Sequence, residues 1–95
     1  MLMWQVNVSK KMVKQSNKLP KHIFSLYINL LIDLKRNGPY RNNWANYSSL
    51  KGKKNVYHCH IKKGKPTYVV IWEIVDKHIK IMEVTYVGTH EKVTY

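Results

Sequence analysis

An apolar run at residues 67–75 constrains the fold more than any other part of the sequence. It is rich in β-branched and aromatic side chains, namely Tyr68, Val69, Val70, Ile71, Trp72, Ile74 and Val75. A short run with little polar alternation is typical of a β-strand that is buried on both faces. Turn-forming residues bound it at 64–66 (Gly-Lys-Pro) and at 76–78 (Asp-Lys-His). The sequence therefore predicts a central strand that tight turns join to its neighbours.

Strand-like segments flank this run. Residues 56–62 and 79–87 are expected to pair with it, so that the last three strands form an antiparallel meander. Residues 2–8 alternate between apolar and polar side chains, which predicts a further strand at an edge of the sheet. The sheet is thus expected to be antiparallel, with about four strands.

Two helices are predicted between the first strand and the meander. Ser9 can cap the first helix, and Pro20 suits the first turn of the second. The second helix has apolar residues at helical spacing and ends at Gly38-Pro39; its stripe comprises Ile23, Tyr27, Leu30, Leu31 and Leu34. The order β-α-α-β-β-β predicts a single α+β domain over residues 1–95, with a helical hairpin packed on one face of the sheet.

The segment between the second helix and the meander shows no clear periodicity. We expect a loop at residues 39–54, and a loop of this length is uncommon in a small domain unless it has a function. It carries several aromatic residues, including Trp44 and Tyr47. They could pack on the core or stack on nucleic-acid bases.

Positive charge is concentrated in the first three quarters of the chain. The formal net charge is +12, and residues 1–72 hold 14 Lys and Arg against one acid, Asp33. Such unbalanced charge opposes a compact state, so we expect a polyanionic partner, with nucleic acid as the first candidate. An acidic protein is also compatible. A membrane surface fits less well, because the densest lysines flank a strand and not an amphipathic helix.

Two features bear on location and redox chemistry. No apolar segment reaches the length of a membrane span, and residues 1–7 lack the pattern of a secretory signal. We therefore expect a cytoplasmic protein with no membrane partner. The single cysteine, Cys59, cannot form an internal disulfide, and its alternation with Tyr57 and Ile61 predicts that it faces the core.

A His-Cys-His segment is the clearest candidate for chemistry. His58 and His60 stand at i and i+2, so they share one face of a strand with Lys62. A metal site would need further ligands, and no second ligand pair at metal spacing is present, so we expect no metal or other cofactor. The two histidines could be structural. They could equally form a catalytic or phosphate-binding face, because imidazole transfers protons near neutral pH.

The residues after the last predicted strand offer a second set of reactive groups. They include His90, Glu91, Lys92 and Tyr95, although a frayed chain end is the ordinary interpretation. RNA cleavage needs one group that takes the 2′-hydroxyl proton, one that protonates the leaving 5′-oxygen, and cations that stabilise the phosphorane. The residue types of this tail and of the His-x-His strand meet these needs together.

The whole chain resembles bacterial RelE/HigB-type toxins of type II toxin–antitoxin systems. The order of elements matches, and so do four local segments: KLP, NGPYRNNW, YHCHIKKGKPTYVVIWEI and EVTYVGTHEKVTY. The resemblance implies a RelE-like fold and a metal-independent mRNA endoribonuclease, or mRNA interferase. Such an enzyme often acts in the ribosomal A site, inhibits translation and is blocked by a cognate antitoxin. The alternative is a non-catalytic RNA- or ribosome-binding module of the same fold.

The resemblance also implies roles for individual residues. Basic side chains before and within the second strand of the chain, residues 56–62, would contact RNA. We assign RNA contact to Lys51, Lys53, Lys54, Lys62 and Lys63, and also to Lys92 in the tail. His60 stands where relatives have an arginine that supports the phosphate. His90 corresponds to an active-site residue at the end of the last strand, and Tyr95 to a near-terminal tyrosine that joins it. His58 has no firm counterpart but joins the predicted catalytic set. Most relatives have arginine at the positions of His60 and His90, so these histidines could transfer protons instead of supplying charge.

Overall fold

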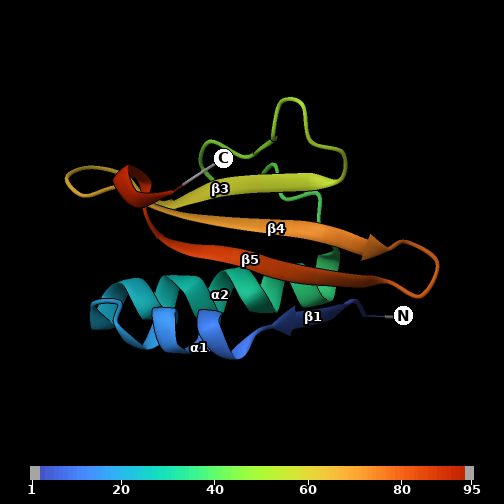
Figure 1. Cartoon of the computed structure of the whole chain (residues 1–95), viewed down its shortest axis with the longest axis horizontal. Helices are drawn as coiled ribbons and strands as arrows, with labels where there is room; N and C mark the ends of the chain where they lie inside the picture. Colours follow the sequence, from blue (N-terminus) through green and yellow to red (C-terminus); the bar gives the residue numbers. More distant parts are fainter. Residues whose placement is uncertain (1–2, 94–95) are drawn as a thin grey trace.

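Five strands form one mixed sheet in the computed structural model, which describes residues 3–93 (Figure 1). The strand order is β1-β5-β4-β3-β2. The strands are β1 (Gln5–Val8), β2 (Ser48–Ser49), β3 (Val56–Lys62), β4 (Tyr68–Asp76) and β5 (Ile81–Thr89). Two helices, α1 (Lys10–Asn17) and α2 (Lys21–Asn37), separate β1 from β2, and a 3-10 turn, His90–Lys92, follows β5. The predicted α+β class is confirmed.

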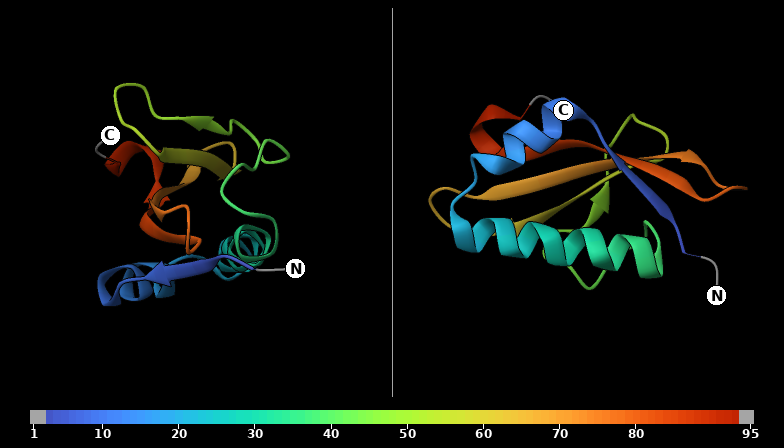
Figure 2. Two further views of the ribbon diagram at one scale, coloured as in Figure 1. Left: turned by 90° about the vertical axis from the view of Figure 1, so that its right-hand side faces the viewer. Right: turned by 90° about the horizontal axis from the view of Figure 1, so that it is seen from below.

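The two helices cover one face of the sheet (Figure 2). α1 begins where predicted, because the Ser9 hydroxyl accepts a hydrogen bond from the backbone N–H of Met12 at 3.2 Å. The buried stripe of α2 contains Ile23, Tyr27, Leu30 and Leu34, four of the five residues predicted from the helical spacing. α2 ends at Gly38, whose φ of 90° lies in the region that favours glycine. Local sequence signals thus explain both helices.

The core lies between α2 and the sheet. Trp72 of β4 is fully buried, and its indole N–H donates to the carbonyl of Pro39 at 3.0 Å. The other face of β4 carries Val69 and Ile71, which are also buried. The prediction that this strand is buried on both faces therefore holds for its first half. It is wrong for the second half, where Glu73 and Val75 are exposed.

The sheet differs from the expected antiparallel one at both edges. β1 lies at an edge, as predicted, but it pairs with β5 in parallel, with Val6 in register with Met82. A parallel neighbour is possible because a long connection, not a hairpin, separates the two strands. At the other edge, β2 adds a fifth strand that pairs with β3. Two serines carry no periodic signal, so the sequence did not indicate this strand.

The loop between α2 and β2 is held by a partly buried hydrogen-bond network. Asp33 accepts from the indole of Trp44 at 2.8 Å, from Asn43 and Asn37, and from Arg41, with which it forms an ion pair at 3.1 Å. Burial alone would raise the pKa of Asp33, but these hydrogen bonds and the Arg41 charge together lower it. This network holds the loop that leads into β2.

The aromatic residues of this loop pack on the body of the protein. The ring of Tyr47 stacks between those of Tyr57 and Trp72, at centroid distances of 5.9 and 6.1 Å. Trp44 packs against the core as well. Of the two interpretations offered by the sequence, core packing is the one that the structure supports.

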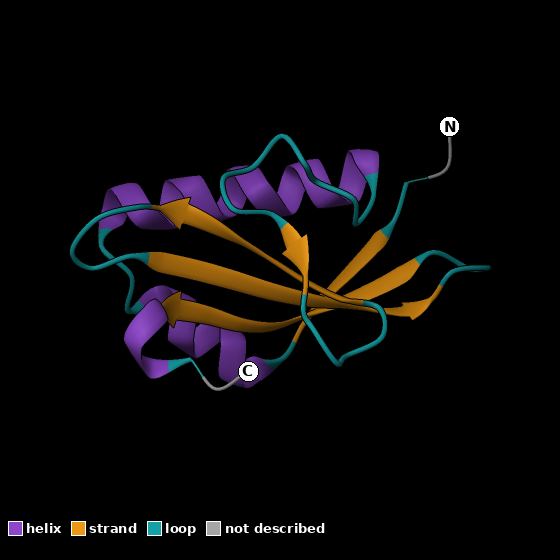
Figure 3. Cartoon of the chain, turned by 90° about the horizontal axis from the view of Figure 1, so that it is seen from above, coloured by secondary structure: helices purple, strands orange, loops and turns teal. Residues whose placement is uncertain are grey.

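Figure 3 looks onto the face of the sheet that the helices do not cover, with the loop that carries β2 crossing it. We call this side of the sheet the uncovered face.

Within residues 3–93, no helix has the length and apolar composition needed to cross a membrane.

Candidate active site

Three histidines converge on the uncovered face of the sheet. His58 and His60 come from β3, and their ring centroids lie 5.7 Å apart with an interplanar angle of 63°. His90 follows β5, and its ring lies 5.7 Å from that of His60, inclined by 74°. We call these three residues the histidine cluster.

A backbone hydrogen bond brings His90 to β3. β4 lies between β3 and β5, so a histidine at the end of β5 does not reach β3 by strand pairing alone. After Thr89 the chain turns into the short 3-10 turn, and the N–H of His90 donates to the carbonyl of Thr67 at 2.8 Å. This bond directs the chain across the end of β4 towards His60.

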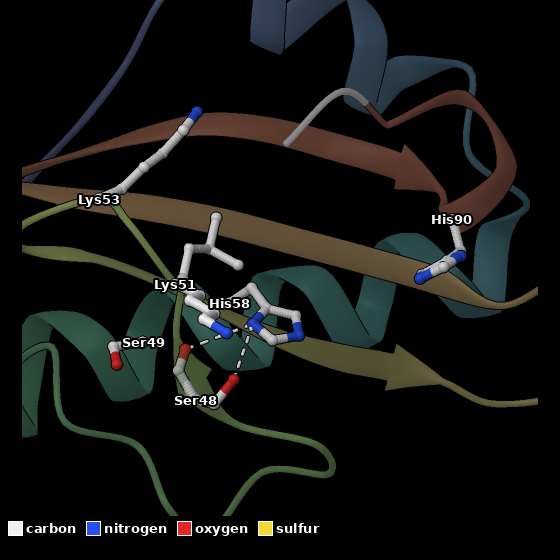
Figure 4. Close-up of a pocket in the computed structure, with 7 residues that line it drawn as sticks. Ser48, Ser49, Lys51, Lys53, His58 and His90 are labelled. Atoms are coloured by element: carbon white, nitrogen blue, oxygen red, sulfur yellow. Dashed lines mark hydrogen bonds between the residues drawn. The ribbon is translucent and has the colours of Figure 1, made fainter.

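The short strand β2 orients His58 (Figure 4). Ser48 is in register with His58, and the imidazole Nδ1 lies 3.3 Å from both the hydroxyl and the carbonyl oxygen of Ser48. A hydrogen bond to the carbonyl requires the proton on Nδ1. The neutral ring then presents the lone pair of Nε2 as its basic site.

The surroundings of His58 and His60 favour their neutral forms. Burial lowers the pKa of His58, and the charge of His90 lowers it further, although the Ser48 backbone hydrogen bond works in the opposite direction. Burial also lowers the pKa of His60, as do the charges of His58, His90 and Lys63. At neutral pH both rings are therefore available as proton acceptors.

A cavity of about 490 Å³ adjoins the cluster. It is lined by residues of β2, of the β2–β3 loop and of the cluster: Ser48, Ser49, Leu50, Lys51, Lys53, His58 and His90 (Figure 4). A second cavity, of about 360 Å³, shares Leu50 and Lys53 with the first and is also lined by Lys92. The two cavities adjoin each other on the uncovered face, and we call them together the basic hollow, because Lys51, Lys53 and Lys92 line them.

The predicted lysines are not equivalent in the structure. Lys51 and Lys53 line the first cavity, Lys53 and Lys92 line the second, and Lys54 is exposed but lines neither. Lys62 and Lys63 follow His60 at the end of β3, where the Lys62 ammonium donates to the Lys63 carbonyl at 3.3 Å. These two lie at the border of the site. The predicted catalytic residue Tyr95 lies outside the described residues.

The sequence interpretation missed some of the residues that build the site. Ser48 and Leu50 belong to a segment without periodicity, so no pattern indicated that they would pair with β3 and line the hollow. Glu73, Thr85 and Tyr86 were taken only as parts of strands, yet they line the second cavity. Their place on the uncovered face near β3 depends on the register of β3, β4 and β5, which composition does not reveal.

Cysteine chemistry does not fit this site. Cys59 is fully buried on the other face of β3, and burial raises the pKa of its thiol to about 12.

Among residues 3–93, no three His, Cys, Asp or Glu side chains lie together as a metal site would require. His78 lies apart from the histidine cluster, in the β4–β5 turn at the far end of β5 from His90.

The chain is similar to solved structures of toxin proteins. No protein-family model matches it, and no curated protein sequence matches it. A chain of the archaeal RelE–RelB complex from Pyrococcus horikoshii OT3 superposes with a TM-score of 0.74 at 18% identity, over 98% of this chain and 100% of that one. The free form of a mutant of E. coli toxin RelE gives 0.72 at 16% identity, over 94% and 85%.

A third structure extends this similarity. The YoeB–YefM complex from Staphylococcus aureus gives a TM-score of 0.67 at 14% identity, over 92% of this chain and 97% of the matched chain. These three likenesses establish that the chain has the RelE-type toxin fold.

Proposed function

We propose that this protein is the toxin of a type II toxin–antitoxin system and a metal-independent endoribonuclease that cleaves mRNA. The observation that carries the proposal is the convergence of His58, His60 and His90 beside Lys51 and Lys53, on the face that the helices leave uncovered. Neutral imidazoles can transfer protons, and lysines can hold phosphates, so the hollow combines the two requirements of RNA cleavage.

The proposed reaction is an in-line attack of the ribose 2′-oxygen on the adjacent phosphorus. His58 or His60, neutral because of its lowered pKa, takes the 2′-hydroxyl proton. The bond from phosphorus to the 5′-oxygen breaks, and that oxygen takes a proton from His90 or from the Tyr95 phenol. The products are a 2′,3′-cyclic phosphate and a 5′-hydroxyl. Lys51 and Lys53 offset the charge that develops on the phosphorane.

A non-catalytic RNA- or ribosome-binding module is the alternative function. The hollow and its lysines would serve a binder equally well, whereas a binder has no need of proton transfer. The two functions therefore differ in what they require of His90 and Tyr95, and variants of these residues separate them.

The proposed partners are an antitoxin, mRNA and the ribosome in the cytoplasm. Two of the similar structures are complexes, RelE–RelB and YoeB–YefM, which supports an antitoxin partner for this chain. A chain with net charge +12 calls for an acidic segment in that partner, and binding should weaken with salt. We expect the antitoxin to protect residues 51–65 or 89–95 from hydrogen exchange.

The deciding experiment expresses the chain without an antitoxin and maps RNA 5′ ends in the cell. New 5′-hydroxyl ends within coding regions are expected for the unchanged chain, and their number should fall sharply for His90→Ala. His78→Ala is the matched control, since this histidine is exposed at the far end of β5. Growth arrest without new ends would support the binding module instead.

A further inference from the structure

The second cavity on the uncovered face has a composition unlike that of the first. Its lining contains the apolar side chains of Val56 and Ile71 together with one carboxylate, that of Glu73. We propose that this cavity is a nucleobase-binding subsite in which Glu73 selects bases that offer hydrogen-bond donors, guanine above the others. The inference rests on the proposed function for the class of substrate and adds the recognition of one base.

Strand register places this subsite next to the histidine cluster. His58 is in register with Ile71, and Ile71 is in register with Tyr86, so this row runs across three strands of the uncovered face. The next row joins Val56 to Glu73. Rows on one face are two residues apart along a strand, about 6.7 Å. A base over the second row would thus belong either to the nucleotide whose phosphate lies at the first row or to the adjacent nucleotide.

The walls of the cavity suit a planar base. Val56 and Ile71 are buried and form an apolar floor, to which Leu50 adds an aliphatic wall. The phenol of Tyr86 donates to the carbonyl of Thr89 at 2.8 Å, which fixes this ring at another wall. Flat apolar and aromatic surfaces of this kind hold unstacked bases in single-stranded RNA. Lys53 and Lys92 line the cavity as well and are suited to the flanking phosphates.

No ion pair or side-chain hydrogen bond within residues 3–93 holds the Glu73 carboxylate. Glu73 is exposed, and the described residues contain a single ion pair, Arg41–Asp33, so no cation of residues 3–93 lies within 4.0 Å of its carboxylate. It is in register with Glu83 on the neighbouring strand, and like charges directly opposite each other are unfavourable. A ligand with hydrogen-bond donors would give the Glu73 carboxylate the close partner that residues 3–93 do not supply.

The acceptor pattern of a carboxylate predicts an order of base preference. Its two oxygens accept in parallel, and the Watson–Crick edge of guanine presents two adjacent donors, N1–H and the N2 amine. Adenine and cytosine each present one amine beside a ring nitrogen that only accepts. Uracil presents one N–H between two carbonyl oxygens, which the carboxylate repels. The expected order is therefore guanine, then adenine and cytosine, then uracil.

The test uses RNA that cannot be cleaved. Fluorescence anisotropy would measure the affinity of the full chain for 2′-O-methyl pentanucleotides of sequence UUNUU, in which N is each of the four bases. The unchanged chain should bind N = G roughly tenfold more tightly than N = U, as one bidentate pair discriminates. Glu73→Gln should lose this preference and gain affinity for N = A, because an amide pairs with adenine by one donated and one accepted bond.

Glu83→Gln is the matched control. It removes the same charge from the neighbouring strand but does not line the cavity, so the preference for guanine should persist. Equal affinity for all four oligonucleotides in the unchanged chain would overturn the inference, and so would equal effects of the two variants. The binding assay does not depend on cleavage. If the chain cleaves RNA but binds the four oligonucleotides equally, only the subsite is overturned. If the chain prefers guanine in the binding assay but does not cleave RNA, the subsite is supported and the proposed ribonuclease activity is overturned.

Discussion

The imidazole rings of His60 and His90 lie 5.7 Å apart, although β4 separates the strands from which they come. The contact forms because the chain turns across the end of β4 after Thr89, where the N–H of His90 donates to Thr67. The charge of His90 helps to lower the pKa of His60. We propose that these two rings and His58 carry out the proton transfers of the reaction.

The proposed ribonuclease makes a direct prediction for His90. His90→Ala should lower the single-turnover cleavage rate by ~10²–10⁴, the usual contribution of a general acid or base. RNA affinity should change little, because the variant keeps Lys51 and Lys53, which we propose hold the phosphates. Cleavage of a labelled RNA measures the rate, and filter binding measures the affinity. The catalytic assignment fails if His58→Ala, His60→Ala and His90→Ala all cleave at the unchanged rate.

The mutual influence of the histidines can be measured by NMR. Burial and the charges of His58, His90 and Lys63 lower the pKa of His60. His58→Asn removes one of these charges, so the pKa of His60 should rise towards the ordinary histidine value near 6.5. A titration of the His60 Hε1 resonance measures this shift, with the exposed His22 as an internal reference. An unchanged or lower pKa for His60 would show that the two rings are not coupled.

The lowered pKa values also predict how stability depends on pH. The folded protein binds fewer protons at His58 and His60 than the unfolded chain does, so stability should decrease as the pH falls below about 6.5. Urea midpoints at pH 7.5 and at pH 5.5 measure this loss. A variant with His58 and His60 both changed to Asn should lose less stability between pH 7.5 and pH 5.5 than the unchanged chain does. An equal loss in the two proteins would show that other groups cause the effect.

The placement of the lysines predicts different salt dependences. Lys53 lines both cavities, whereas Lys77 lies in the β4–β5 turn at the other end of the sheet. Lys53→Ala should flatten the log–log plot of RNA affinity against salt by roughly 0.7, the value for one phosphate contact on a single strand. Lys77→Ala should leave the slope unchanged. Equal slopes for both variants would place RNA elsewhere on the protein.

The hydrogen-bond network of Asp33 predicts a local effect on stability. Asp33→Ala removes the acceptor of partly buried donors of Trp44 and Arg41, so the free energy of unfolding should fall by about 1–3 kcal/mol at pH 7. The stabilisation by the Asp33 carboxylate should also disappear as the pH falls below the ordinary carboxyl range, because its pKa is lowered in the folded protein. Urea unfolding measures both effects, with Lys35→Ala, an exposed residue of α2, as the control.

The parts of the fold that depend on local signals were predictable from the sequence. The apolar stripe of α2 and the turn residues around β4 act over a few positions, and both elements form where expected. The His-x-His spacing likewise predicted that His58 and His60 share a face, because side chains on a strand alternate.

Long-range relationships could not be read in the same way. The parallel partner of β1 and the contact of His90 with β3 depend on how distant segments pack. Glu73 shows the same limit: its neighbours Val56 and Glu83 become apparent only once the register of three strands is known. The pairing of Ser48 with His58 rests on a strand of two residues, too short for any periodic signal.

The parallel pairing of β1 with β5 also bears on how the protein folds. Both helices and strands β2, β3 and β4 lie between these two strands in the chain, so the pairing of Val6 with Met82 closes a loop that contains most of the domain. Contacts between residues so far apart in sequence carry a large loop-closure entropy, and parallel pairing is intrinsically slow. We therefore expect β1 to join the sheet late in folding, after the antiparallel pairs of the meander have formed.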